Sequence, residues 1–293
     1  MWLRHNRGRV AAYVMLAVLL IVAGAYVLTP GAGPESDEAL FGEARRGGLT
    51  VALRDQVGDV AITEARVPGR PIVLIDAGHG GRDPGASAVS GTIKEKELTL
   101  AFARELRDLL AKHQRVRVAL TRDGDRTLTL DQRAAIARQL GASLLISVHM
   151  DSAPNPLARG ATVYSLSDVA SDSEAARFAS AENDEGGLSS ERDSGLRYLL
   201  SDLALRDQMS ESADLATRMV SGRARGMLLR PEPHKFAAFH ILRRSEVPGV
   251  LFEAGYISNV DDEALLRTVE GRAPIVAELA RAIEIDAALR QSR

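Results

Sequence analysis

The sequence of 293 residues contains no cysteine, and it has no excess of either charge. The absence of cysteine excludes disulfides, thiolate nucleophiles and Cys-ligated metal sites, so His, Asp and Glu remain as the strong metal ligands. Because 37 basic residues oppose 39 acidic ones, there is no basic field, and nucleic acid is not an expected partner. The Gly-x-Ser-x-Gly turn of serine hydrolases is also absent. Hydrophobic residues make up 45% of the chain, which is enough for a sizeable core.

The N-terminus has the pattern of an export signal. Three arginines in the first nine residues precede an uncharged run at residues 10–29, rich in Val, Leu, Ile and Ala. We predict that residues 1–29 are a signal peptide or a transmembrane anchor. Both remain open, because residues 10–29 can just span a bilayer and Ala23, Gly24 and Ala25 offer a cleavage site. In either case the rest of the chain is expected outside the cytoplasm, in the periplasm or an equivalent compartment.

The remainder of the chain is expected to form a linker and one catalytic domain. Residues 30–70 are rich in proline, glycine and charge, which is typical of a linker, although alternation near residues 51–62 allows an edge strand. From residue 71 to 293, short β-branched runs alternate with segments of helical apolar periodicity. This pattern predicts an α/β fold, with a single mixed, mostly parallel β-sheet flanked by helices on both faces. The expected strands are residues 72–75, 116–121, 144–148, 161–164 and 250–252, and a helical tail is expected from 261 to about 289.

Three polar residues occupy equivalent positions relative to the predicted strands. His79 lies in the glycine-rich turn after the first strand, His149 follows the strand that ends at residue 148, and Glu253 follows the last one. In open α/β sheets, ligands bind beyond the carboxyl ends of the strands. A lone histidine at a strand end is usually structural, but three polar residues at one edge can converge on a site.

Glu95 is a fourth candidate with two interpretations. It completes a capping box with Thr92, in which case its role is structural. Alternatively, its position in the first turn of a helix lets it face the same crevice. Two histidines and one carboxylate would leave a zinc ion one open position, as in catalytic zinc sites, and Glu253 suits the additional base. Of the other histidines, only His234 is kept as a candidate substrate contact.

Four blocks of sequence carry a family resemblance. Residues 75–86, followed by Glu95 and Lys96, resemble the opening signature of the zinc-dependent N-acetylmuramoyl-L-alanine amidases of the Amidase_3 family. Residues 120–133, 147–149 and 248–259 resemble the remaining blocks of that family in the same order. The resemblance extends from residue 71 nearly to the C-terminus.

The resemblance implies that His79, Glu95 and His149 bind Zn²⁺ and that Glu253 is the catalytic glutamate. The implied reaction is hydrolysis of the amide between N-acetylmuramic acid and L-alanine in peptidoglycan, with zinc-activated water and Glu253 as general base. Such a reaction serves cell-wall remodelling and cell separation. Two alternatives stay open, namely another exported zinc peptidase or deacylase and a catalytically inactive wall-binding protein.

Residues 165–211 form a segment longer than ordinary loops, with an acidic first part and a leucine stripe in its second. The segment resembles the regulatory insertion of division-associated amidases, in which a helix blocks the active site until an activator protein removes it. Glu182 is the residue expected to make that autoinhibitory contact. The alternative interpretation is a solvated acidic loop followed by a packed helix.

Overall fold

The computed structural model describes residues 59–184, 196–221 and 226–291, with side chains described from residue 203 onward in the second range. The expected export segment at residues 1–29 and most of the expected linker therefore lie outside the described residues. Within the described ranges, none of the helices combines the length and the apolarity that crossing a bilayer requires.

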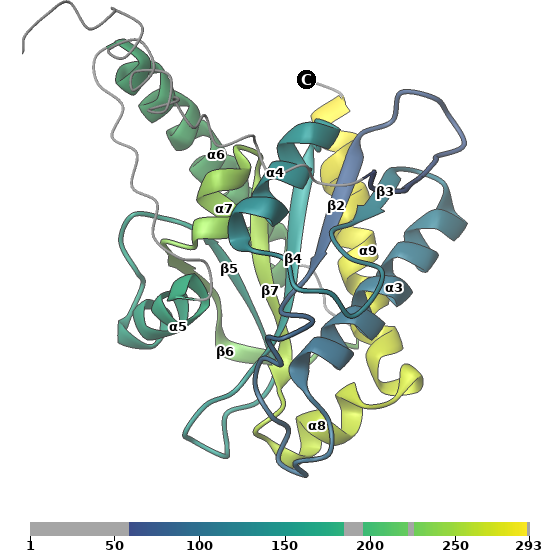
Figure 1. Cartoon of the computed structure of the whole chain (residues 1–293), viewed down its shortest axis with the longest axis vertical. Helices are drawn as coiled ribbons and strands as arrows, with labels where there is room; N and C mark the ends of the chain where they lie inside the picture. Colours follow the sequence, from purple (N-terminus) through teal and green to yellow (C-terminus); the bar gives the residue numbers. More distant parts are fainter. Residues whose placement is uncertain (1–58, 185–195, 222–225, 292–293) are drawn as a thin grey trace, which may run out of the picture. The chain divides into compact units, whose positions relative to one another are not determined.

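A mixed seven-stranded sheet forms the centre of the described part, in the order β1-β3-β2-β4-β7-β5-β6 (Figure 1). Strand β5 is antiparallel to β7 and β1 is antiparallel to β3, whereas the other four pairings are parallel. The prediction of a mixed, mostly parallel sheet is thus confirmed. The strands are β1 (Ile62–Thr63), β2 (Ile72–Ala77), β3 (Arg117–Leu120), β4 (Leu144–Asp151), β5 (Ala161–Leu166), β6 (Leu229–Ala237) and β7 (Gly249–Tyr256).

Helices cover both faces of this sheet. One apolar cluster joins α3 (Glu95–His113), α6 (Leu196–Ser221) and α9 (Val269–Gln291) to one face, and a second joins α4 (Leu130–Leu140), α5 (Ser173–Asp184) and α7 (His240–Ser245) to the other. The central strands β2, β4 and β7 are buried on both faces, which explains why their sequences are almost continuously apolar rather than alternating.

One expected boundary and one expected helix differ from the structure, and one strand was not expected. The sheet begins before residue 71, because β1 pairs with β3 and Ile62 packs against the core. The helical tail expected from residue 261 is divided into α8 (Val260–Leu266) and α9. Strand β6 is not predicted by the sequence patterns, because Pro231 and Pro233 argue against a strand; it lies at the edge of the sheet, where a missing N–H is tolerated.

The segment at residues 165–211 is not a single appended unit. It starts inside β5 and ends inside α6, which begins at Leu196. The later part of α6 contributes Leu215 and Ala216 to the main core, so α6 is part of the domain itself. Only α5 and the residues that join it to α6 remain as a candidate insertion.

Candidate active site

The predicted site residues meet at the carboxyl ends of the central parallel strands. His149 on β4 and Glu253 on β7 are direct Cα partners across the sheet. His79 follows β2 within two residues, and the N–H of Gly78 donates to the carbonyl of Val148 on β4. Glu95 is the first residue of α3. Four separate elements therefore deliver one side chain each to the same place.

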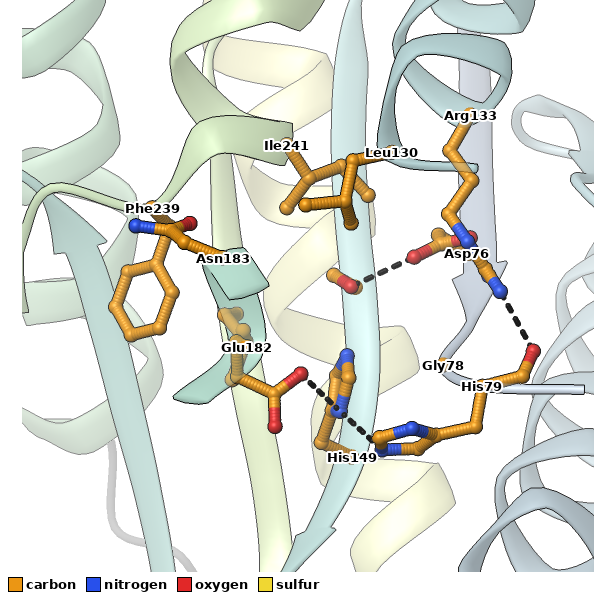
Figure 2. A pocket seen from close by; sticks show the side chains of 12 residues that line it. Asp76, Gly78, His79, Leu130, Arg133, His149, Glu182, Asn183, Phe239 and Ile241 are labelled. Atoms are coloured by element: carbon orange, nitrogen blue, oxygen red, sulfur yellow. Dashed lines mark hydrogen bonds and ion pairs between the residues drawn. The ribbon is translucent and has the colours of Figure 1, made fainter. Parts of the chain in front are cut away.

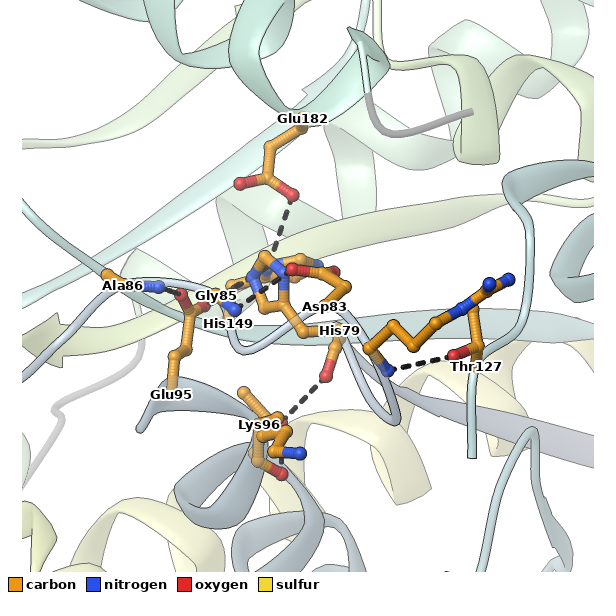
Figure 3. A network of polar contacts seen from close by, with 12 residues as sticks. His79, Asp83, Gly85, Ala86, Glu95, Lys96, Thr127, His149 and Glu182 are labelled. Atoms are coloured by element: carbon orange, nitrogen blue, oxygen red, sulfur yellow. Dashed lines mark hydrogen bonds and ion pairs between the residues drawn. The ribbon is translucent and has the colours of Figure 1, made fainter. Parts of the chain in front are cut away.

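The side-chain atoms of three of these residues are close enough to share one ligand (Figure 3). The distance from His79 Nε2 to Glu95 Oε1 is 3.0 Å, and the distance from His79 Nε2 to His149 Nδ1 is 3.2 Å. His149 Nδ1 also lies 3.4 Å from Glu95 Oε1. All three residues are buried, so their orientation is determined by the fold rather than by solvent.

Two glycines make room for this arrangement. A Cβ atom at Gly78 would lie 2.5 Å from Cε1 of His149, and one at Gly85 would lie 2.6 Å from Oε2 of Glu95. Real Cβ atoms do not approach other atoms so closely, and Gly85 also has a φ of +63°. The glycine-rich sequence after β2 is therefore required by the packing of the site residues.

Two of the three candidate ligands, His79 and Glu95, are oriented by further contacts. Oδ2 of Asp83 lies 2.8 Å from Nδ1 of His79, which leaves Nε2 directed at the convergence point. Glu95 accepts hydrogen bonds from the backbone N–H groups of Ala86 and Met150, both at 2.9 Å. This role of Asp83 is not predicted from the sequence. A carboxylate four residues after a candidate ligand histidine could have indicated it, because such a group often orients the ligand.

The capping interpretation of Glu95 is wrong. The N-cap of α3 is Lys94, and Glu97 completes the capping box by accepting from the Lys94 N–H at 3.2 Å. Glu95 therefore does not cap the helix. Its carboxylate faces the two histidines instead.

The charges around the convergence point favour a cation. Burial by itself would raise the pKa of Glu95, but His79 and His149 lower it below its usual value. Burial would lower the pKa of His149, whereas the carboxylates of Glu182 and Glu95 raise it above its usual value. Positive charge is therefore stabilised at the point where the side chains meet.

Glu253 has a different environment. Its side chain is completely buried, and neither carboxyl oxygen has a hydrogen-bond partner among the residues that the structure describes. Burial raises the pKa of Glu253 well above its ordinary value, and the charges of Asp151 and Glu95 raise it further. Since buried polar atoms are nearly always hydrogen-bonded, such a carboxyl group is expected to serve an incoming molecule.

Helix α5 brings a fourth donor to the site. Oε2 of Glu182 lies 3.3 Å from Nδ1 of His149, and the two side chains line one cavity together with His79 and residues of α4 and α7 (Figure 2). Donor atoms of His79, His149 and Glu182 all lie within 4.8 Å of one another, a spacing that could hold a metal ion. Glu182 therefore forms part of the wall of this cavity.

Comparison with known proteins agrees with this geometry. Residues 73–285 match the family model described as N-acetylmuramoyl-L-alanine amidase, Amidase_3. The chain belongs to the Amidase_3 family. It is 34% identical over 220 residues to the N-acetylmuramoyl-L-alanine amidase AmiA of Escherichia coli, covering 73% of this chain and 75% of that one. It is also 34% identical over 206 residues to the probable amidase AmiB of Haemophilus influenzae, covering 67% of this chain and 47% of that one.

A solved structure shares the fold of this amidase. The catalytic domain of CwlV, an N-acetylmuramoyl-L-alanine amidase from Paenibacillus polymyxa, superposes with a TM-score of 0.51 at 25% identity, covering 73% of this chain and 96% of that chain. The resemblance inferred from the sequence motifs is therefore confirmed. The chain is an enzyme of this amidase class.

A buried ion pair supports the histidine turn of the amidase. Arg133 on α4 donates to the carboxylate of Asp76 at 2.7 Å and to the backbone carbonyls of Ala77 and His79 at 2.7 and 2.6 Å. His79 has a φ of 58°, an unusual conformation for a residue other than glycine, and Arg133 stabilises it directly. The sequence motifs contain both residues, but their contact is not predicted from the sequence.

Two other histidines in the described part of the amidase have partners outside this group. Nε2 of His234 lies 2.9 Å from Oγ of Ser165, and burial lowers the pKa of His234. His113, the last residue of α3, pairs with Glu284 at 2.7 Å. The suggestion that His234 contacts substrate has no support in these contacts.

Proposed function

We propose that this amidase cleaves the bond between the lactyl group of N-acetylmuramic acid and the L-alanine of the peptidoglycan stem peptide, with zinc and water. Amidase activity follows from the family, whereas the use of zinc and the role of each residue are part of the proposal. One observation carries it, namely three buried donor atoms within 3.4 Å of one another beside a buried carboxyl group that has no hydrogen-bond partner among the described residues.

The donor set fits zinc. Two imidazole nitrogens and one carboxylate oxygen, from His79, His149 and Glu95, are a ligand set of catalytic zinc sites, which keep one position open for water or substrate. Asp83 supplies the carboxylate that usually orients a zinc-binding histidine. Zinc would supply Lewis acidity there, polarising the amide carbonyl and lowering the pKa of water to about 7.

Glu253 is the general base of the proposed mechanism. Its carboxylate would accept a proton from the attacking water and pass it to the nitrogen of the departing alanine. A carboxyl group with a raised pKa suits both steps, because it can hold the proton between them. Neither step needs a nucleophilic side chain.

The products decide between this proposal and its alternatives. Purified sacculi incubated with the enzyme should release stem peptides with a free L-alanine amino group, as detected by mass spectrometry, and a chelator should stop the release. A zinc peptidase would instead cut within the peptide, and a wall-binding protein would release nothing. Zinc analysis of His79→Ala and His149→Ala tests the ligand set, because each variant should lose bound zinc together with activity.

We also propose that α5 holds the enzyme in an inactive state through Glu182. The carboxylate of Glu182 lies 3.3 Å from His149 Nδ1, where it competes with substrate for the open position. Displacement of α5 by an activator protein would expose the site, so the closed and open states form an equilibrium that the activator shifts.

The test is Glu182→Ala, because deleting residues 165–211 would also remove parts of β5 and α6. The variant should hydrolyse sacculi faster than wild type in the absence of any partner. Asp184→Ala, which alters an exposed residue of the same helix, should not. A folded Glu182→Ala protein that binds zinc and has wild-type activity would contradict autoinhibition.

Because the substrate is cell-wall peptidoglycan, we propose that the enzyme acts outside the cytoplasm. We propose further that residues 10–29 export the chain or anchor it in the membrane. A C-terminal reporter that functions only outside the cytoplasm should be active, and N-terminal sequencing of the exported protein would show whether cleavage occurs near Ala25. Cytoplasmic accumulation of the full-length protein would refute this location.

A further inference from the structure

Two basic side chains lie beneath the first turn of α5. Arg230 and Lys235 belong to β6, and their side chains are 19% and 6% exposed. Glu174 of α5 pairs with both of them, each at 2.8 Å, and Asp172 pairs with Lys235 at 3.0 Å. Both acidic side chains are 35% exposed, so the cations lie deeper in the protein than the anions that cover them.

The basic pair adjoins the active site. Arg230 donates to the hydroxyl of Tyr256, and its guanidinium carbon lies 5.1 Å from the centre of the Tyr256 ring. The Tyr256 hydroxyl in turn bonds to the carboxyl of Asp151, next to the catalytic region. Glu253 pairs with β5, and β5 pairs with β6, so the β6 backbone lies two strand spacings of about 4.8 Å, or about 10 Å, from the backbone of Glu253.

Removal of α5 would leave these cations without their partners. Because α5 also covers the two cations, its removal would expose them and make them available to pair with another anion in place of Glu174 and Asp172. Arginine is particularly suited to bind carboxylates, since its planar group donates two parallel hydrogen bonds.

The substrate has such an anion only on one side of the scissile bond. The carboxyl group of N-acetylmuramic acid is consumed in the amide itself, so the free carboxylates belong to the peptide. An extended peptide rises about 3.3 Å per residue, and about 10 Å therefore corresponds to about three residues. A carboxylate on the second or third residue of the stem peptide is within reach of Arg230.

We infer that Arg230 and Lys235 form a subsite for a carboxylate of the stem peptide, and that Glu174 occupies this subsite in the closed enzyme. The inference rests on the proposed function. Helix α5 then blocks the site at two points, because Glu182 covers the candidate zinc ligands and Glu174 imitates the acidic peptide.

The test compares two soluble muramoyl peptides that differ only in the second residue, which carries either a free α-carboxylate or a carboxamide. The quantity measured is the ratio of kcat/KM for the acid to kcat/KM for the amide, with the full-length enzyme. Any change in the fraction of open enzyme multiplies both values equally, so the ratio is independent of autoinhibition. Wild type should prefer the acid by about tenfold or more, as expected for hydrogen bonds to a charged group.

Arg230→Gln should lower this ratio to about one, and Arg230→Lys should retain part of the preference because the charge remains. Arg104→Gln is the matched control, since Arg104 lies on α3, on the other face of the sheet from α5, and pairs with Asp123; its ratio should equal that of wild type. Thermal melting shows whether each variant is folded. If Arg230→Gln does not fold, Lys235→Gln takes its place, because it should also lower the ratio.

Equal cleavage of the two substrates by wild type, or an unchanged ratio in folded Arg230→Gln, would overturn the inference and leave the proposed function intact. If neither wild type nor Glu182→Ala cleaved either substrate, the proposed function and this inference would fail together.

Discussion

The contact between Asp76 and Arg133 makes a quantitative prediction about stability. Both side chains are almost completely buried, at 1% and 4% exposure. The carboxylate of Asp76 accepts from Arg133, Thr121 and Ser147, each at 2.7 Å. Asp76→Asn keeps the shape of the side chain and removes its charge, which leaves the guanidinium of Arg133 in the interior without a counter-charge.

Breaking a buried ion pair in this way costs about 3–5 kcal/mol. We expect the lower value, about 3 kcal/mol, because Arg133 retains its bonds to the backbone carbonyls of Ala77 and His79. In a domain of this size, 1 kcal/mol shifts Tm by about 2–4 °C, so the variant should melt roughly 6–12 °C below wild type. Urea unfolding should show a lower midpoint with an unchanged m value.

The pH dependence gives a second check on the same pair. Burial would raise the pKa of Asp76, but Arg133 and two hydroxyl groups lower it below its usual value of 3.8. A lowered pKa means that the stabilisation is complete above pH 3.8 and is lost as the pH falls through the pKa of the folded state. The gap between wild type and Asp76→Asn should therefore be constant from pH 5 to 7 and shrink in acid.

Asp123→Asn is the matched control, because Asp123 is 55% exposed and pairs with Arg104 and Arg107 at the surface. It should change the free energy of unfolding by less than about 1 kcal/mol. A gap below about 1 kcal/mol for Asp76→Asn at pH 7, or a gap that widens in acid, would refute the reasoning.

Three further predictions concern the site itself. Glu253→Gln should retain zinc by metal analysis and lose about 10²–10⁴-fold in kcat on sacculi, and near-normal turnover would remove Glu253 from the mechanism. Gly78→Ala should displace the His149 ring and lower zinc occupancy while circular dichroism stays native, because the new Cβ would lie 2.5 Å from that ring. Asp83→Ala should weaken zinc affinity about 10–100-fold in a competition titration, and an unchanged affinity would show that Asp83 does not orient His79.

The positions of His79, His149 and Glu253 are predictable from sequence for a physical reason. Each follows or ends a short apolar run, and the carboxyl ends of neighbouring parallel strands must lie at the same edge of the sheet. The strand pattern therefore implies their proximity before any coordinates are known. The α/β class follows in the same way, because buried parallel strands and amphipathic helices have different apolar periods.

Other features depend on contacts that a linear pattern does not contain. Glu95 is compatible with a capping box until the backbone shows that Lys94 is the cap. The prolines of β6 argue against a strand until the edge position is known. The sequence alone therefore decides neither the role of Glu95 nor the presence of strand β6. Each depends on which residues or strands lie next to it in the folded protein.

The pairing of Arg230 with Glu174 illustrates the same limit over a greater distance. The two residues are 56 positions apart, on a helix and on a strand, and no spacing rule connects them. The sequence alone determined the family, the α/β class and the edge of the sheet where the site lies, because these follow from periodicity and local motifs. Only the tertiary structure decided which charges are neutralised in the interior and which carboxyl group has no hydrogen-bond partner in the described part of the chain, since burial depends on the packing of the whole domain.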